Sequence, residues 1–80
     1  MPMAFVMINT ELGSEKEVLD EIRKIDEVKE SCIVYGIHDI AVKIGAKTME
    51  ELDDIVTWVR NLDKIQGTVT LILIEGEKVN

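Results

Sequence analysis

The sequence has 80 residues, enough for one small domain that buries roughly 60–65% of the surface its unfolded chain would expose. Apolar residues make up 46% of it and aromatic residues only 4%, which is more aliphatic material than a monomer of this size easily hides and indicates association. The net charge of −7 repels phosphate backbones and acidic membrane surfaces, which argues against direct binding to nucleic acid or membrane.

The first predicted element is a strand over residues 4–9, because AFVMIN is short, apolar and bounded by the stretch TELGS. Ser14 and Glu17 have the spacing of a capping box, in which each side chain bonds a free backbone N–H at the start of a helix. Apolar residues then recur at helical spacing in one stripe: Val18, Leu19, Ile22 and Ile25. The sequence therefore predicts a helix that begins at Ser14.

Two strands joined by a short turn are predicted next, over residues 28–35 and 39–45. The segment VKESCIVY alternates loosely between faces, whereas DIAVKIG alternates well. Cys32 is the only cysteine, so neither an intrachain disulfide nor a cysteine-based metal site can form within one chain. We interpret Cys32 as a small hydrophobic residue of the core.

A second helix and a last strand complete the pattern. Thr48 and Glu51 repeat the capping-box spacing, and Trp58 lies beside the apolar stripe that follows. That stripe consists of Leu52, Ile55, Val56, Val59 and Leu62. Residues 67–75, GTVTLILIE, are rich in β-branched and apolar side chains and predict the final strand.

The order β-α-β-β-α-β is typical of a ferredoxin-like α+β sandwich, in which two helices cover one face of a four-stranded antiparallel sheet. We expect residues 1–80 to form a single domain, with its core in about residues 4–75. The other face of the sheet then needs a cover, which a second subunit supplies most simply. We therefore expect a dimer through this open face, with Ile72 and Ile74 of the last strand at the interface.

Few residues suggest catalysis. His38 and Asp39 are neighbours, but adjacent side chains in an extended turn tend to point to opposite sides, and no serine or second histidine completes a catalytic set nearby. We interpret the acidic cluster of the second helix as a solvated helix start favoured by the helix dipole. It comprises Glu50, Glu51, Asp53 and Asp54. We expect no catalytic residue, no metal site and no cofactor.

Four other residues could contact a ligand. Tyr35 and Trp58 are large enough to stack on one, with half-buried packing as the alternative. Thr68 and Thr70 share one face of an aliphatic strand, where their hydroxyl groups need hydrogen-bond partners or water. On a dimer-facing side these threonines would suit a polar ligand, and the ordinary β-propensity of threonine is the alternative.

The distribution of apolar residues along the sequence predicts where in the cell the protein is located. No apolar run approaches the roughly 20 residues of a membrane span. Residues 1–9 lack the basic start and the length of a signal peptide. We therefore expect a cytoplasmic protein.

The segment VKESCIVYGIHDIAVKI resembles the effector domain of the Lrp/AsnC regulators, in which a Gly-x-x-Asp turn, here Gly36 to Asp39, joins two apolar strands. The ending GTVTLILIE is similar to that family's final strand, with a Thr-x-Thr step at Thr68 and Thr70. With the element order, the resemblance covers about residues 4–75. Family members that bind DNA carry an N-terminal helix-turn-helix, and no residues remain here to build one. The resemblance therefore implies a stand-alone effector domain, called a RAM domain.

The resemblance implies a dimer of facing sheets, gathered into a ring such as an octamer or decamer. A small ligand, usually an amino acid, binds in the family where subunits meet, at the cleft that holds the turn. Gly36 permits a close backbone approach or a positive φ. The exposed backbone N–H groups of the turn suit a carboxylate, and Asp39 could accept from an α-ammonium. The implied ligand-binding residues are Tyr35, Gly36, His38, Asp39, Thr68 and Thr70.

The leading hypothesis is a module that senses an amino acid or joins full-length Lrp/AsnC-type regulators in mixed oligomers, and so modulates transcription without binding DNA itself. One alternative is a cofactor-free enzyme such as a monooxygenase, because dimeric ferredoxin-like barrels include such enzymes. Its pocket residues would be Tyr35, His38 and Trp58. Another alternative is an ACT-like allosteric domain, which shares the element order.

Overall fold

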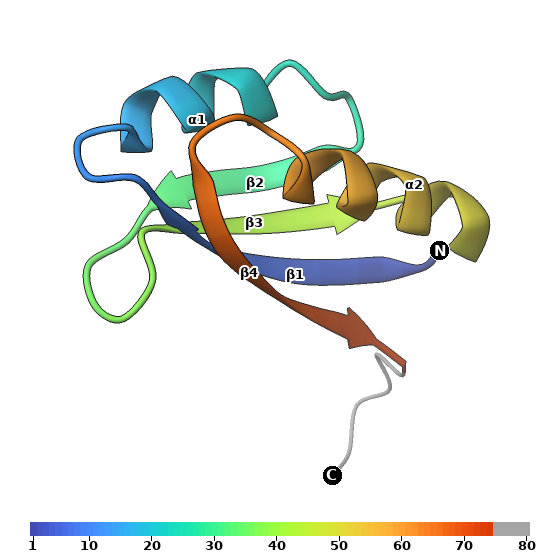
Figure 1. Ribbon diagram of the computed structural model, residues 1–80. Helices are drawn as coiled ribbons and strands as arrows, with labels where there is room; N and C mark the ends of the chain where they lie inside the picture. Colours follow the sequence, from blue (N-terminus) through green and yellow to red (C-terminus); the bar gives the residue numbers. More distant parts are fainter. Residues whose placement is uncertain (75–80) are drawn as a thin grey trace, which may run out of the picture.

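The computed structural model describes residues 1–74, in which four strands and two helices follow one another in the predicted order (Figure 1). They are β1 (Met3–Thr10), α1 (Glu15–Ile22), β2 (Val28–Ile33), β3 (Ile40–Gly45), α2 (Met49–Arg60) and β4 (Ile65–Leu73). The ferredoxin-like α+β fold is thereby confirmed. Glu75, the predicted end of the last strand, lies outside the described residues. Neither helix in this part of the chain is long and apolar enough to cross a membrane.

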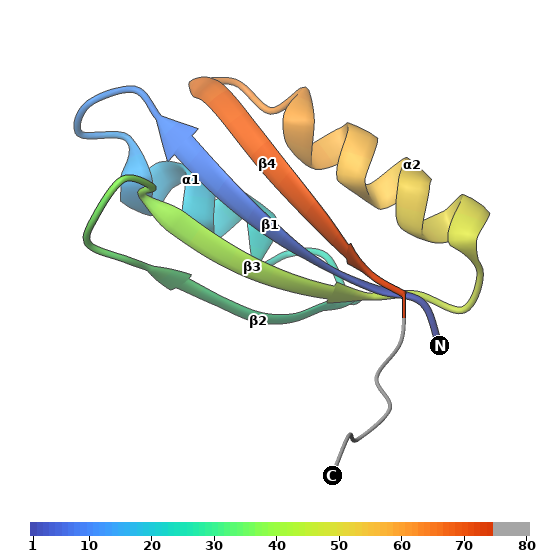
Figure 2. The same ribbon diagram turned by 90° about the horizontal axis from the view of Figure 1, so that it is seen from below.

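The strands form one antiparallel sheet in the order β2-β3-β1-β4, so β1 lies between β3 and β4. Both helices cover the same face of the sheet (Figure 1). Figure 2 shows the sheet from the side that carries no helix. We call the covered side the helix face and the other side the open face.

Alternation along β1 determines which face each of its side chains occupies. Ala4, Val6 and Ile8 are fully buried on the helix face, and the residues between them are half-buried on the open face. The core under the helices continues with buried residues of β3 and of both helices: Ile40, Val42, Ile44, Val18, Leu19, Ile22, Leu52, Val56 and Val59. This core is entirely aliphatic, in keeping with the low aromatic content.

The open face carries an apolar stripe along β1 and β4. Residues that stand opposite each other in two antiparallel strands point to the same face of the sheet. Every second residue of β4 stands opposite one of the half-buried residues of β1. The stripe therefore consists of Met3, Phe5, Met7, Val69, Leu71 and Leu73. Leu71 is 52% exposed and Val69 is 47% exposed, so the open face presents apolar surface to solvent.

Ile72 does not belong to this stripe. It pairs with Ala4 and so points to the helix face, which means that its prediction as a residue of the open face is wrong. At this end of β4 both the odd-numbered and the even-numbered residues are apolar, so the hydrophobic pattern could not show which set points to which face of the sheet. Ile74 follows the end of β4 and is 94% exposed.

Cys32 is exposed, so its interpretation as a core residue is wrong. It pairs with Ala41, which in turn pairs with Met7 of the stripe, and all three lie on the open face. The register of the edge strand β2 turns Ser31 and Ile33 toward the helix face instead, opposite buried residues of β3.

The two helices begin differently although their sequences share one pattern. Thr48 Oγ1 accepts from the backbone N–H of Glu51 at 3.1 Å, as the capping box predicts. Ser14 makes no side-chain cap bond, so the capping box predicted there is wrong. Its φ of −102° and ψ of 5° are not the extended values that an N-cap needs, whereas Thr48 has φ −134° and ψ 160°. Glu17 pairs instead with Lys64, at 3.3 Å.

Candidate functional site

The turn of residues 34–39 joins β2 to β3 and is fastened to the end of β1 by Asp39. The N–H of Asp39 donates to the carbonyl oxygen of Ile8 at 2.9 Å, and its Oδ2 accepts from the N–H of Thr10 at 2.9 Å. Its carbonyl oxygen accepts from the N–H of Val34, also at 2.9 Å. One carboxylate oxygen thus holds the turn in place, and the other makes no hydrogen bond within residues 1–74.

His38 is held by Asn9, the amide that ends the apolar run of β1. Asn9 Nδ2 donates to the carbonyl oxygen of Ile37 at 2.8 Å, and Asn9 Oδ1 lies 2.8 Å from His38 Nδ1. Asn9 has the same parity as Met7, so its side chain leaves β1 on the open face. Asn9 was not predicted as a site residue, although a lone amide at the end of AFVMIN was a visible signal.

The tip of the turn projects away from the rest of the chain. Gly36 has φ +148°, a conformation that residues with a side chain rarely adopt, which explains why glycine stands there. Apart from the glycine and its two chain neighbours, no described residue has an atom within 4 Å of the position that a Cβ of residue 36 would take. Tyr35 is fully exposed and Ile37 is 86% exposed, so Tyr35 is not packed within the described residues.

Thr68 and Thr70 lie on the other side of the sheet from Asn9. They pair with the buried residues Ile8 and Val6, so they point to the helix face, and their expected position on a dimer-facing side is wrong. Thr68 lines a polar hollow of about 250 Å³ beside the exposed side chain of Arg60. The structure therefore does not bring the two threonines together with the turn on one face.

Gly67 stands opposite Asn9 in the β1–β4 pair. Apart from the glycine and its two chain neighbours, no described residue has an atom within 4 Å of the place where a Cβ of residue 67 would stand, so this position beside Asn9 is open. The next pair along the strands, Met7 with Val69, is apolar. At this end of the open face, an amide and a histidine ring thus lie beside apolar side chains. Small-molecule sites typically combine apolar side chains with a few polar groups.

The remaining predicted residues belong to the helix layer. Trp58 is 45% exposed and lines a shallow apolar depression with Ile25, Asp54 and Ile55. The acidic residues that begin α2 are exposed or half-buried: Glu50, Glu51, Asp53 and Asp54. Within residues 1–74, no group of histidine, cysteine or carboxylate side chains is arranged to hold a metal ion.

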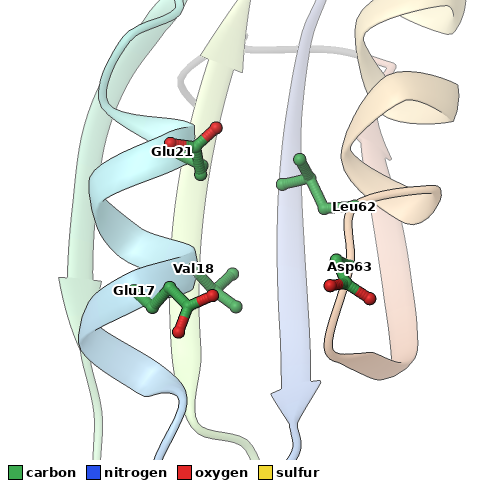
Figure 3. A pocket seen from close by; sticks show the side chains of 5 residues that line it. All are labelled: Glu17, Val18, Glu21, Leu62 and Asp63. Atoms are coloured by element: carbon green, nitrogen blue, oxygen red, sulfur yellow. The ribbon is translucent and has the colours of Figure 1, made fainter.

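A pocket of about 190 Å³ lies between α1 and the segment that follows α2 (Figure 3). It is lined by Glu17, Val18, Glu21, Leu62 and Asp63. Glu17 is paired with Lys64 at 3.3 Å and Glu21 with Lys24 at 2.6 Å. The hydrogen bond from Lys24 to Glu21, with the charge of that carboxylate, raises the pKa of Lys24 above its ordinary value. This pocket is acidic and lies in the helix layer, so it is separate from the turn and repels a ligand carboxylate.

The ferredoxin-like fold thus carries an open apolar face that ends at a polar turn. The chain belongs to the Lrp/AsnC ligand-binding domain family, whose family model matches residues 3–79. Members of this family are regulatory domains of transcription regulators and are not enzymes. The chain is therefore a regulatory effector domain, and neither the monooxygenase alternative nor the ACT-like alternative is supported.

Relatives agree with this assignment. The chain is 32% identical over 76 residues to the HTH-type transcriptional regulator FL11 of Pyrococcus furiosus, a match that covers 95% of this chain and 50% of that protein. It spans about half the length of the curated relatives it matches. Hypothetical protein PHS023 from Pyrococcus horikoshii is 38% identical, with a TM-score of 0.87 over 94% of this chain and 92% of that chain. TTHA0845 from Thermus thermophilus is 29% identical, with a TM-score of 0.90 over 99% of this chain and 100% of that chain.

Proposed function

We propose that this chain assembles with copies of itself and modulates transcription without contacting DNA itself, by sensing a small molecule, an amino acid, or by joining full-length Lrp/AsnC-type regulators. The observation that carries the proposal is the polar turn at the end of an apolar sheet face. An amino acid needs donors for its carboxylate, acceptors for its ammonium group and an apolar surface for its side chain.

The proposed site supplies all three needs. Backbone N–H groups around Gly36, where the glycine leaves the chain uncovered, suit the carboxylate. The second carboxylate oxygen of Asp39 suits the ammonium group, and His38 and Tyr35 flank the ligand. The ligand side chain reaches the space beside Gly67. Thr68 and Thr70 point to the other face and are left out of the proposed site.

A second copy of the chain is the proposed cover of the open-face stripe. Leu71 and Val69 of this stripe are about half exposed in the single chain. Removing such apolar surface from water favours association. Because the turn lies at the end of the same face, such a dimer would put it at a subunit junction, and rings such as an octamer or decamer would extend that junction.

A ligand screen tests the amino-acid site. Thermal shift with the proteinogenic L-amino acids, followed by calorimetry, should find at least one that binds. Asp39→Asn keeps an oxygen for the Thr10 N–H but removes the charge, and should weaken binding by about 1.5–3 kcal/mol, or about ten- to a hundredfold. Gly67→Leu should block binding by filling the space beside Asn9.

The matched control for these variants is Asp53→Asn, which removes an exposed charge of α2 and should leave the affinity unchanged. Circular dichroism should show that all three variants are folded. If Asp39→Asn and Gly67→Leu both bind with the affinity of the unchanged protein, the ligand site lies elsewhere.

The 80-residue polypeptide should not bind duplex DNA, because its net charge is −7 and it has no basic stripe. At about 150 mM salt, close to physiological ionic strength, the fluorescence anisotropy of a labelled duplex should not rise when micromolar protein is added. A helix-turn-helix regulator with its operator is the positive control. Saturable binding by the polypeptide alone would contradict the proposed role.

A further inference from the structure

We propose that Asn9 holds His38 in the tautomer that carries its proton on Nδ1, so that Nε2 accepts a hydrogen bond from an N–H group of the ligand. Asn9 is then a positioning residue and His38 a ligand-contacting one. The existence of the ligand rests on the proposed function, whereas the tautomer is a property of the protein without ligand.

The tautomer follows from two hydrogen bonds that share Asn9. The carbonyl oxygen of Ile37 can only accept, so the side-chain atom of Asn9 that faces it at 2.8 Å must be the NH₂ nitrogen. That orientation leaves Asn9 Oδ1 facing His38 Nδ1 at 2.8 Å. An amide oxygen has no hydrogen to give, so Nδ1 must donate. A neutral imidazole protonated on Nδ1 has a bare lone pair on Nε2.

The free lone pair adds a second side-chain acceptor to the one that Asp39 leaves unbonded. Asp39 has one oxygen bound to the Thr10 N–H, which leaves one oxygen for a ligand. His38 is half-buried, and its Nε2 makes no hydrogen bond within residues 1–74. The two adjacent residues therefore offer two acceptors, which suit a ligand with more than one N–H donor. A primary ammonium group has three such donors, and a quaternary ammonium group has none.

The tautomer can be measured directly, because His38 is the only histidine of the chain and its imidazole ¹⁵N signals are unambiguous. At a pH where the ring is neutral, long-range ¹H–¹⁵N correlation spectra of the ligand-free protein should show the proton on Nδ1. Asn9→Ala removes the acceptor and should shift the population toward the Nε2–H form.

The control for the spectra is Asn61→Ala, which deletes an amide that bonds the Thr57 carbonyl oxygen at the end of α2 and should leave the imidazole signals unchanged. A proton on Nε2 in the unchanged protein would overturn the inference and would leave the proposed function intact.

The acceptor role is tested with two substitutions of His38, each of which retains a polar group near only one of the two ring nitrogens. His38→Asn keeps a donor near the position of Nδ1 but has nothing at Nε2, whereas His38→Gln places an amide oxygen near Nε2. The probe is the proteinogenic amino acid with the largest thermal shift. His38→Asn should weaken its binding about tenfold or more, the contribution of one charge-assisted hydrogen bond, and His38→Gln should stay within about threefold.

The outcomes separate this inference from the proposed function. Equal losses in the two variants, or a larger loss in His38→Gln, would overturn the acceptor role while amino-acid binding stands. The N-trimethyl derivative of the same amino acid has no N–H donor, so its affinity for the unchanged protein should be no higher than the affinity of the parent amino acid for His38→Asn. Equal affinities of parent and derivative for the unchanged protein would also overturn the acceptor role. If no amino acid binds the unchanged protein, the proposed function fails and the acceptor role with it.

Discussion

At the scale of single residues, Lys64 adopts a backbone conformation that side chains disfavour. Its φ is +70°, in the left-handed region where glycine, asparagine and aspartate are the usual residues. Two contacts hold it there: its carbonyl oxygen accepts from the N–H of Glu11 at 2.9 Å, and its ammonium group lies 3.3 Å from the Glu17 carboxylate. The ion pair is largely solvated and contributes about 0–1 kcal/mol, so the backbone hydrogen bond is the more important constraint.

Substitutions at Lys64 should separate backbone strain from the ion pair. Lys64→Gly and Lys64→Val both delete the ammonium group, so the difference between them reports on the conformation. We expect Lys64→Val to be less stable than Lys64→Gly by roughly 1–2 kcal/mol, because a β-branched side chain crowds the backbone at positive φ. Urea unfolding measures this difference, and equal midpoints would mean that the connection relaxes out of the left-handed region.

The residues of the turn were only partly predictable. Gly36 and Asp39 have a recognisable spacing, and of the two possibilities left open for Gly36, a close backbone approach or a positive φ, the structure has the positive φ. The role of Asp39 in fastening the turn to β1, and that of Asn9 in holding His38, depend on partners 29 residues apart in sequence. Such contacts follow from strand register, which local patterns do not specify.

At the scale of elements, the two helix starts show what a capping pattern leaves open. Both have the sequence Ser or Thr, two residues, then Glu, yet only Thr48 makes the side-chain bond. The preceding chain decides the outcome: Ser14 follows Gly13, whose φ is +83°, in a tight turn, so its own backbone is not extended. The pattern therefore located both helix starts but described only one of them correctly.

Alanine at the two caps should give different losses of stability. Thr48→Ala removes the acceptor of the Glu51 N–H and should cost about 0.5–2 kcal/mol of folding free energy. Ser14→Ala removes no cap bond and should cost clearly less. Thermal unfolding of both variants measures the contrast, and a Ser14→Ala loss as large as that of Thr48→Ala would show that Ser14 caps α1 in solution.

At the scale of the whole molecule, the number, type and order of the elements could be predicted because the helices have a clean period and the strands are short apolar segments with recognisable boundaries. The assignment of residues to the two faces of the edge strands could not. Residues of β4 near its end are apolar on both parities, and Cys32 of β2 is apolar within a loosely alternating strand. The register against β1 and β3, which brings together residues far apart in the chain, settles these faces.

The proposed dimer is tested by placing a charge in the open-face stripe. Leu71→Lys should convert the assembly to a monomer, because an unpaired charge buried at an interface costs several kcal/mol. Leu12→Lys is the matched control, since Leu12 is 99% exposed in the loop after β1. Sedimentation velocity compares the two. A Leu71→Lys variant that keeps the oligomeric state of the unchanged protein would place the interface on another surface.

The central position of β1 has a consequence for the synthesis of the chain on the ribosome. This strand is made first, but one of its two neighbours, β4, is made last. At about 5–20 residues per second, β1 waits several seconds with an unpaired apolar edge after it has emerged. Unpaired strand edges recruit other chains, so each nascent molecule is exposed to aggregation until its own final strand arrives. The domain is therefore expected to complete its folding only after β4 has emerged from the ribosome, and fast synthesis or chaperone capture should favour its yield.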